Sequence, residues 1–177
     1  MLKDIKSVLF ATNLLEDCLP AFESAVRIAS KYHAVLFLLH VRDQKLPTRL
    51  EEQLRDGMGE DRWQRLMAEH DQEVRETLIG KMTQDKIAQK AMRMYYTEAG
   101  LEENNTRLRY SELVVKGHSI PDTIIDQAIE QDCDLIVLGS QKGFRKKNAV
   151  GSVTKGVLHQ TAVPVLVVPS RQKQTGS

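Results

Sequence analysis

The chain has few of the features that identify a disulfide-stabilised, membrane-spanning or exported protein. Its 177 residues include two cysteines, Cys18 and Cys133, and neither belongs to a metal-binding or redox motif, so we expect free thiols in a reducing compartment. No window approaches 18 uninterrupted apolar residues, which predicts that no transmembrane helix is present. The apolar run near the N-terminus is too short for a signal peptide, and we therefore expect a cytoplasmic protein.

The sequence also lacks an excess of positive or negative charge. Lys and Arg total 25 and Asp and Glu total 24, which gives a formal net charge of +1. A near-neutral chain gives no global reason to expect nucleic acid or an anionic membrane as a partner. The five histidines show no H-E-x-x-H spacing and no Cys/His ligand pattern, so we expect no metal site.

What the sequence does contain is a series of short apolar runs, the pattern of strands buried on both faces of a parallel sheet. They cover residues 8–11, 34–41, 134–139 and 165–168, and a fifth, partly polar strand is expected around 107–115. Helical patterns lie between the strands. This alternation predicts an α/β fold with an open, doubly wound, five-stranded parallel sheet and helices on both faces. We expect one domain over residues 1–170 and a disordered tail over 171–177.

Particular residues are expected to bound the helices or to face the core. Pro20 suits a first helical turn, Ser119 can cap a helix, and Gly100 is typical of a helix end with Leu101 packing behind it. The apolar residues expected to point inward are Ile120, Ile124, Ile125, Ala128 and Ile129 in one helix, and Val153, Val157 and Leu158 in the next.

The connection over residues 47–100 is enlarged, charged and helical in period. Gly57, Gly59 and Gly80 predict interruptions, so we expect two or three helices rather than one. Trp63 and Met67 stand among charged residues. Packing on the sheet or on a dimer partner is the favoured interpretation of these two side chains, and a recognition surface for another protein is the alternative.

Ligands of open parallel sheets bind beyond the carboxyl ends of the strands, and three segments are expected to converge there. They are Ala11-Thr12-Asn13, Val41-Arg42-Asp43 and the loop from Gly139 to Ser152, which holds three glycines and four cations. Glycines let a backbone approach phosphate, and the following helix start offers free N–H groups. The alternative interpretation is a flexible basic loop that only connects a strand to a helix.

Four stretches, in this order and spacing, resemble the universal stress protein family over nearly the whole chain. They are VLFATNLLEDCLPAFESAVRIA, LFLLHV, VVKGHSIPDTIIDQAIEQDCDLIVLGS and GSVTKGVLHQTAVPVLVVP. The resemblance implies the sheet order 3-2-1-4-5, a homodimer and, in many members, an adenine-nucleotide site. In that order the apolar strand Val165-Leu166-Val167-Val168 lies at a sheet edge, where pairing with a second copy would cover it.

The family's nucleotide binders carry G-x2-G-x9-G-[S/T], and this chain departs from that pattern. Gly139 and Gly151-Ser152 match, but Gly143 follows one residue late and Lys142 takes the place of the second glycine. Asn13 stands where those binders usually have Asp. We therefore expect ATP or ADP to bind weakly or not at all, with phosphates at Gly151-Ser152. The expected site residues are Ala11, Thr12, Asn13, Val41, Gly139, Lys142, Gly143, Gly151, Ser152 and Val153.

No catalytic motif accompanies this site. G-x-S-x-G, G-x4-G-K-[ST] and G-x-G-x-x-G are absent, so we expect no dedicated enzyme and no catalytic residues. Glu16 and Asp17 are interpreted as a solvated helix cap rather than metal ligands. Three functions stay open: a stress-response regulator that binds adenine nucleotide, a nucleotide-free dimeric protein-interaction module, and a weak nucleotide hydrolase. The protein partner is unknown.

Overall fold

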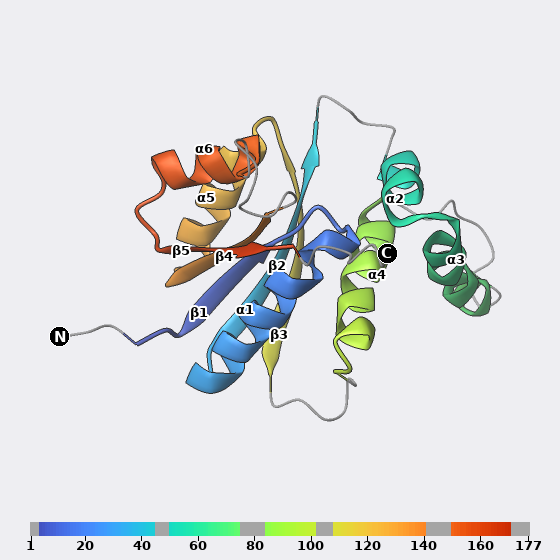
Figure 1. The fold of residues 1–177 in the computed structure, drawn as a ribbon, viewed down its shortest axis with the longest axis horizontal. Helices are drawn as coiled ribbons and strands as arrows, with labels where there is room; N and C mark the ends of the chain where they lie inside the picture. Colours follow the sequence, from blue (N-terminus) through green and yellow to red (C-terminus); the bar gives the residue numbers. More distant parts are fainter. Residues whose placement is uncertain (1–3, 45–49, 75–83, 102–107, 141–149, 171–177) are drawn as a thin grey trace, which may run out of the picture.

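A sheet of five parallel strands forms the centre of the molecule (Figure 1). The computed structural model describes residues 4–44, 50–74, 84–101, 108–140 and 150–170, with side chains for all of these except 69–74. The strand order is β3-β2-β1-β4-β5, which confirms the predicted fold class and order. The strands are β1 (Ser7–Ala11), β2 (Val35–Asp43), β3 (Arg109–Gly117), β4 (Leu135–Ser140) and β5 (Val165–Pro169).

Helices cover both faces of this sheet because its central strands are apolar on both sides. Val8 and Phe10 of β1 point to a cluster that includes α1 (Leu19–Tyr32) and α4 (Gln84–Glu98). Leu9 and Ala11 point the other way, to a cluster built with α5 (Ile120–Glu130) and α6 (Ser152–Gln160). Among the described helices, none is long and apolar enough to cross a membrane.

The predicted helix boundaries are confirmed where the local chemistry is strong. Pro20 lies in the first turn of α1, and the Ser119 hydroxyl accepts a hydrogen bond from the Asp122 amide, 3.4 Å away. Gly100 ends α4 with φ +69°, and the Leu101 amide donates back to the Tyr96 carbonyl at 2.8 Å. That reversal is the expected C-terminal motif of a helix that ends in glycine.

Two expectations about the helix faces are wrong. Ile129 is 67% exposed and Leu158 is 47% exposed, because each follows a residue that already occupies the inward face of its helix, Ala128 or Val157. The strand expected around 107–115 extends two residues further, to Gly117, which pairs with β2 and whose carbonyl accepts from the amide of residue 44.

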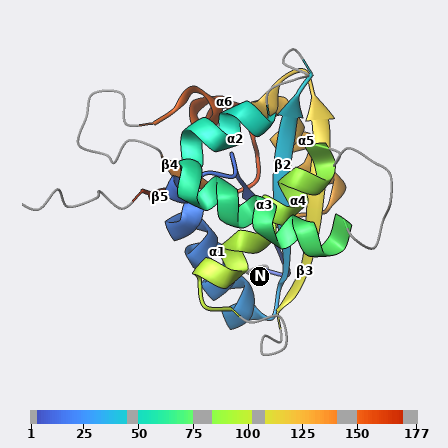
Figure 2. The ribbon, with the colours of Figure 1, turned by 90° about the vertical axis from the view of Figure 1, so that its right-hand side faces the viewer.

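The connection between β2 and β3 holds three described helices, α2 (Leu50–Met58), α3 (Glu60–Val74) and α4. We call residues 47–100 the helical insertion; Figure 2 shows its helices on one side of the molecule. Gly59, which has φ +81°, separates α2 from α3, as predicted. Gly57 lies inside α2 and does not interrupt it, and Gly80 lies outside the described residues. Trp63 is 8% exposed in the main core cluster, which supports the packing interpretation.

Helix α6 is held against α5 by a close contact that only glycine permits. A Cβ atom on Gly156 would lie 2.7 Å from Cγ and 2.9 Å from Cβ of Pro121, a rigid ring. We expect Gly156→Ala to lower the free energy of unfolding by about 1–3 kcal/mol, although alanine favours helix by about 1 kcal/mol over glycine. Urea denaturation measures this effect, and a Gly156→Ala variant more stable than the wild type would contradict it.

Candidate functional site

A cavity of about 740 Å³ opens at the carboxyl ends of β1, β2 and β4, within the size range of small-molecule sites. All of the predicted site residues that the structure describes line this cavity, and they come from β1, β2, β4, α6 and the adjoining loops. These residues are Ala11, Thr12, Asn13, Val41, Gly139, Gly151, Ser152 and Val153. Lys142 and Gly143 lie outside the described residues. The convergence of strand ends and helix start that the sequence predicts is therefore present.

The start of α6 forms one wall of this cavity. Gly151 is its N-cap, with φ −63° and ψ 163°, a conformation open to any residue, and no side chain caps the helix there. A Cβ atom at Gly151 would meet no heavy atom of residues 4–44, 50–68, 84–101, 108–140 or 150–170 within 4 Å. No described acidic residue lies in the first turn of α6, so its N–H groups and positive dipole end face the cavity without a fixed anion.

Gly139 is a glycine for a different reason. A Cβ atom at Gly139 would lie 3.3 Å from Cys18 Sγ and 3.5 Å from the Cys18 Cα. The lack of a side chain at Gly139 therefore lets the short helix η1 (Glu16–Cys18) pack closely on β4. Burial raises the pKa of the Cys18 thiol to about 11. Cys18 and Cys133 are both free thiols. Cys18 at the cavity wall is therefore a protonated packing residue rather than a nucleophile.

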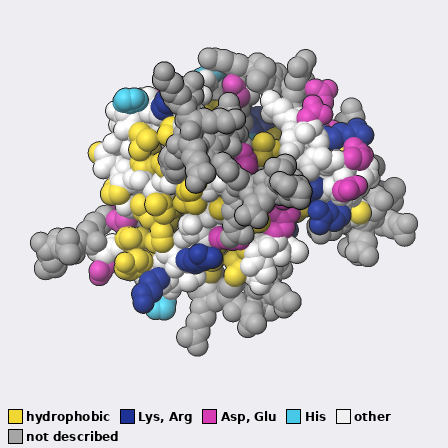
Figure 3. Space-filling model, viewed as in Figure 1, with side chains coloured by type: hydrophobic (Ala, Val, Ile, Leu, Met, Phe, Trp, Pro, Cys, Tyr) yellow, Lys and Arg dark blue, Asp and Glu magenta, His cyan; other side chains and the backbone are white. Residues whose placement is uncertain are grey.

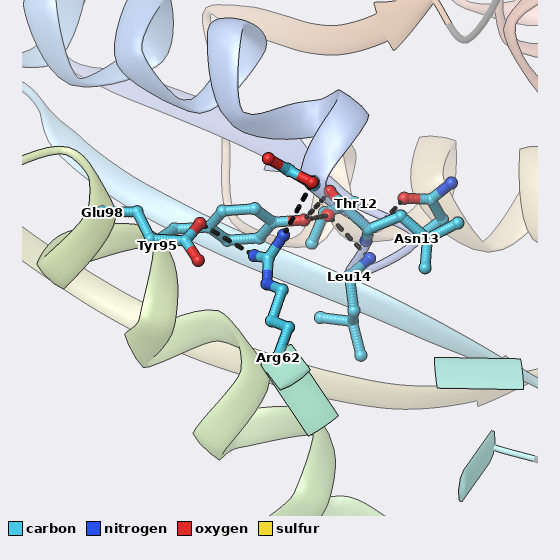
Figure 4. A network of polar contacts seen from close by, with 8 residues as sticks. Thr12, Asn13, Leu14, Arg62, Tyr95 and Glu98 are labelled. Carbon is cyan, nitrogen blue, oxygen red and sulfur yellow. Dashed lines mark hydrogen bonds and ion pairs between the residues drawn. The ribbon is translucent and has the colours of Figure 1, made fainter. Parts of the chain in front are cut away.

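The loop after β1 is held by contacts on every side of Thr12 (Figure 4). Its amide donates to the Leu39 carbonyl at 2.9 Å, and its carbonyl lies 3.0 Å from His40 Nδ1. Its hydroxyl lies 2.8 Å from the Tyr95 hydroxyl and accepts from the Leu14 amide at 2.9 Å. Thr12 is thus a structural anchor of the cavity.

His40 is a buried, neutral histidine behind this loop. Burial lowers the pKa of its imidazole, and the Arg42 charge lowers it further, while its contact with the Thr12 carbonyl acts in the opposite direction. A carbonyl only accepts hydrogen bonds, so Nδ1 carries the proton. His40 lines the cavity from β2 but uses its one N–H to hold the loop.

Asn13, one of the expected site residues, uses its side chain oxygen within the protein. Its Oδ1 accepts from the Leu15 amide and from Cys18 Sγ, both at 3.0 Å. A hydrogen bond from Asn13 also lowers the pKa of Asp17, against burial, which raises it more. An aspartate at position 13 would face this second carboxylate and repel it. The amide thus suits a loop that already contains Asp17.

The interpretation of Glu16 and Asp17 as a solvated cap is wrong for Asp17, which is partly buried. Its Oδ1 is buried without a hydrogen-bond partner among the described residues, although Glu16 is more exposed. Burial of an incompletely paired carboxylate is the main reason its pKa is raised. No group of three or more His, Cys, Asp or Glu with metal-site geometry occurs in the part of the chain that the structure describes.

Helix α2 closes the cavity opposite α6, which the sequence did not indicate. Leu50, Gln53, Leu54 and Asp56 contribute to the lining, and Gly57 lets α2 approach the β1 loop. A Cβ atom on Gly57 would lie 2.5 Å from Cδ2 of Leu15. At the same edge, Arg42 Nη2 donates to Gln84 Oε1 at 2.7 Å, and Nη1 pairs with Asp85, which ties β2 to the start of α4.

Comparisons with solved structures agree with this architecture. A universal stress protein in complex with cAMP superposes with a TM-score of 0.56 at 19% identity, over 96% of this chain and 100% of that one. UspA from Lactobacillus plantarum gives 0.58 at 23% identity, over 94% and 99%. A universal stress protein from Archaeoglobus fulgidus in complex with dAMP gives 0.55 at 16%, over 93% and 98%. These likenesses show the fold.

The family itself is shown by sequence. No curated protein matches the chain. The model of the universal stress protein family matches residues 4–169, which include all five strands and both walls of the cavity. With the strand order, the cavity and the start of α6 in agreement, the chain belongs to the universal stress protein family.

Proposed function

We propose that this protein is a stress-response regulator that binds an adenine nucleotide, ATP or ADP, in the cavity between α6 and α2. One observation carries the proposal. Gly151 opens α6 at the cavity wall in an ordinary backbone conformation, with empty space where a side chain would be. Among the residues that the structure describes, nothing requires glycine there, whereas a phosphate group seated on a helix N-terminus does require that space.

The ligand fits the chemistry of the two ends of the cavity. Backbone N–H groups of Gly151 to Val153 and the Ser152 hydroxyl would donate to phosphate oxygens. Val41 and the apolar side chains of Leu138 and Ile124 offer a surface for the adenine ring. The complexes of two universal stress proteins with cAMP and dAMP support an adenine nucleotide as the ligand class.

We propose binding without dedicated turnover. Two candidate groups at the cavity are engaged within the protein, since Cys18 is a buried thiol and His40 Nδ1 holds the Thr12 carbonyl. Arg42, the one described cation of the lining, is paired with Asp85. Because this cation is occupied and the family motif is incomplete, affinity is expected to be lower than in motif-complete relatives, by about 5- to 150-fold.

The test is the nucleotide content and affinity of the purified protein. Mass spectrometry of protein denatured after purification detects retained nucleotide, and calorimetry with ATP, ADP and AMP measures affinity. Saturable binding of any of the three supports the proposal. Absence of binding at millimolar nucleotide would contradict it and favour the nucleotide-free interaction module. Phosphate release that persists in a Gly151 variant unable to bind would assign hydrolysis to a contaminant or another site.

The second part of the proposal is a homodimer formed through β5. This strand lies at the edge of the sheet and its residues Val165 to Val168 are half-buried and apolar. Figure 3 shows hydrophobic side chains gathered over the face where β5 lies in Figure 1. An unpaired apolar edge invites pairing with another strand, and a two-fold axis closes the assembly.

Backbone directions make this dimer testable at one residue. The Pro164 carbonyl accepts from the Ile136 amide, and the Ser170 amide donates to the Ser140 carbonyl. The backbone N–H and C=O groups of even-numbered β5 residues therefore point to β4, and the N–H of Val167 points to the free edge of the sheet. We expect Val167→Pro to give a monomer in light scattering at micromolar concentration, while Val167→Thr stays dimeric like the wild type. A monomeric wild type would contradict the dimer.

A further inference from the structure

Tyr95 links the helical insertion to the cavity loop across 83 sequence positions. It lies on α4, and its side chain is fully buried. Its ring stacks on Phe22, with centroids 5.4 Å apart, and meets Phe10 edge-on at 6.0 Å. Packing on both neighbours fixes where the hydroxyl lies. Tyr95 does not line the cavity itself, so any influence on a ligand passes through the loop.

The direction of each hydrogen bond at this hydroxyl follows from counting protons. Tyr95 donates its single proton to the Leu15 carbonyl, 2.7 Å away, because a carbonyl can only accept. It therefore accepts from the Thr12 hydroxyl at 2.8 Å. Thr12 in turn accepts from the Leu14 amide at 2.9 Å. Burial raises the pKa of Tyr95 far above its usual value, so the donated proton stays in place.

The loop held in this way has a conformation that needs support. Leu14 has φ +69°, in the left-handed region that residues with a side chain rarely adopt. Such a conformation persists where surrounding contacts fix it. The Tyr95 hydroxyl supplies contacts on both sides of Leu14, at Thr12 and Leu15. Thr12 and Leu15 also line the cavity, so the shape of the loop sets the shape of the site.

A second residue of the insertion, Arg62, lies near the segment that follows the loop. Arg62 of α3 is 5% exposed, and its Nη2 donates to Glu98 of α4 at 2.8 Å. Its Nη1 lies 3.9 Å from the Glu16 carboxylate at the start of η1. Figure 4 shows the Tyr95 side chain reaching Thr12 of the β1 loop, with Glu98 pointing to Arg62 beside it. The insertion therefore holds the loop itself through Tyr95 and approaches the next residue along the chain, Glu16, through Arg62.

From this juxtaposition we propose that Tyr95 is a positioning residue of the ligand site: its hydroxyl holds the Thr12–Leu15 loop in the shape that binds nucleotide. The inference rests on the proposed function. It makes affinity depend on a side chain that the ligand does not touch. Because linkage is reciprocal, a bound nucleotide stabilises the Tyr95 contacts by the same factor by which those contacts raise affinity. Occupancy of the cavity is thereby transmitted to α4.

The test uses Tyr95→Phe, which removes the hydroxyl and keeps the ring, with Tyr96→Phe as the matched control. The Tyr96 hydroxyl is also buried but has no hydrogen-bond partner among the described residues. We expect Tyr95→Phe to weaken ATP binding about 5- to 30-fold in calorimetry and to speed amide hydrogen exchange over residues 12–15 without ligand. Tyr96→Phe is expected to change neither quantity.

Further measurements separate positioning from general destabilisation. ATP is expected to slow amide exchange in α4 of the wild type and of Tyr96→Phe, but not of Tyr95→Phe. Thr12→Val combined with Tyr95→Phe should lose no more affinity than the larger single effect, because both remove one network. Equal losses of affinity in Tyr95→Phe and Tyr96→Phe, at a temperature where both are folded, would overturn the inference.

The outcomes distinguish this inference from the proposed function. If the wild type and Tyr95→Phe bind ATP equally well, the positioning role is wrong and nucleotide binding stands. If the wild type binds no adenine nucleotide, the proposed function fails, and the positioning of a nucleotide site fails with it. Exchange over residues 12–15 in the free protein still shows in that case whether the hydroxyl orders the loop.

Discussion

Replacing Gly151 by Asp is expected to abolish measurable nucleotide binding while leaving the protein as stable as the wild type or slightly more so. Aspartate is a favoured N-cap residue and its charge complements the positive end of α6, which together stabilise a helix by about 0.5–1 kcal/mol. No heavy atom of the described part of the chain lies within 4 Å of the new Cβ, so the side chain enters without a clash there. The same carboxylate occupies the proposed place of a phosphate and repels it.

The size of this effect makes it decisive. Loss of charge-assisted contacts together with like-charge repulsion corresponds to at least about a 100-fold weaker affinity in calorimetry. Lys155→Gln is the matched control, because it changes the net charge by the same amount on an exposed position of α6 that does not line the cavity. Its affinity should stay within about twofold of the wild type. Undiminished ATP binding by Gly151→Asp would place the nucleotide elsewhere or remove the proposed site altogether.

Trp63→Ala is expected to have the largest effect on stability. A buried aromatic side chain truncated to alanine costs about 3–5 kcal/mol, and Trp63 belongs to the main core cluster although it lies in the insertion. For a chain of this length the melting temperature should fall by about 6–20 °C. Circular dichroism measures this fall, since the substitution removes the only tryptophan in the sequence.

Two comparisons show whether that loss reflects packing. Ile129→Ala removes a large apolar side chain that is mostly exposed, and its free energy of unfolding should change by less than about 0.5 kcal/mol. In the wild type, tryptophan fluorescence and circular dichroism should report one melting temperature if the insertion unfolds with the sheet. Unchanged stability of Trp63→Ala, combined with loss of a bound protein partner, would instead support the recognition surface.

The sheet could be predicted from sequence because buried parallel strands are continuous apolar runs with few alternative readings. The 135–140 strand and the 165–169 strand are of this kind. The buried face of a helix is harder to predict than a buried strand. An apolar residue adjacent to the inward position, such as Ile129, has the same composition as a core residue, and only its angle around the helix axis decides its exposure.

The cavity could be predicted in part, for a topological reason. Ends of parallel strands meet at one edge, so Thr12, Val41 and Gly139 had to lie together once the sheet order was known. The contributions of α2 and Tyr95 could not be predicted in the same way. An amphipathic pattern shows which face of a helix is buried but not what it is buried against, and Tyr95 meets Thr12 through tertiary packing alone.

The contact of Asn13 with Asp17 has a consequence for any redesign of this loop. An aspartate at position 13 would place a second carboxylate beside Asp17, and each carboxylate would raise the other's pKa in a half-buried loop. Replacing Asn13 by aspartate alone creates a doubly charged loop, whereas neutralising position 17 first avoids that intermediate. An engineer who introduces aspartate at position 13 should therefore neutralise position 17 beforehand or in the same step.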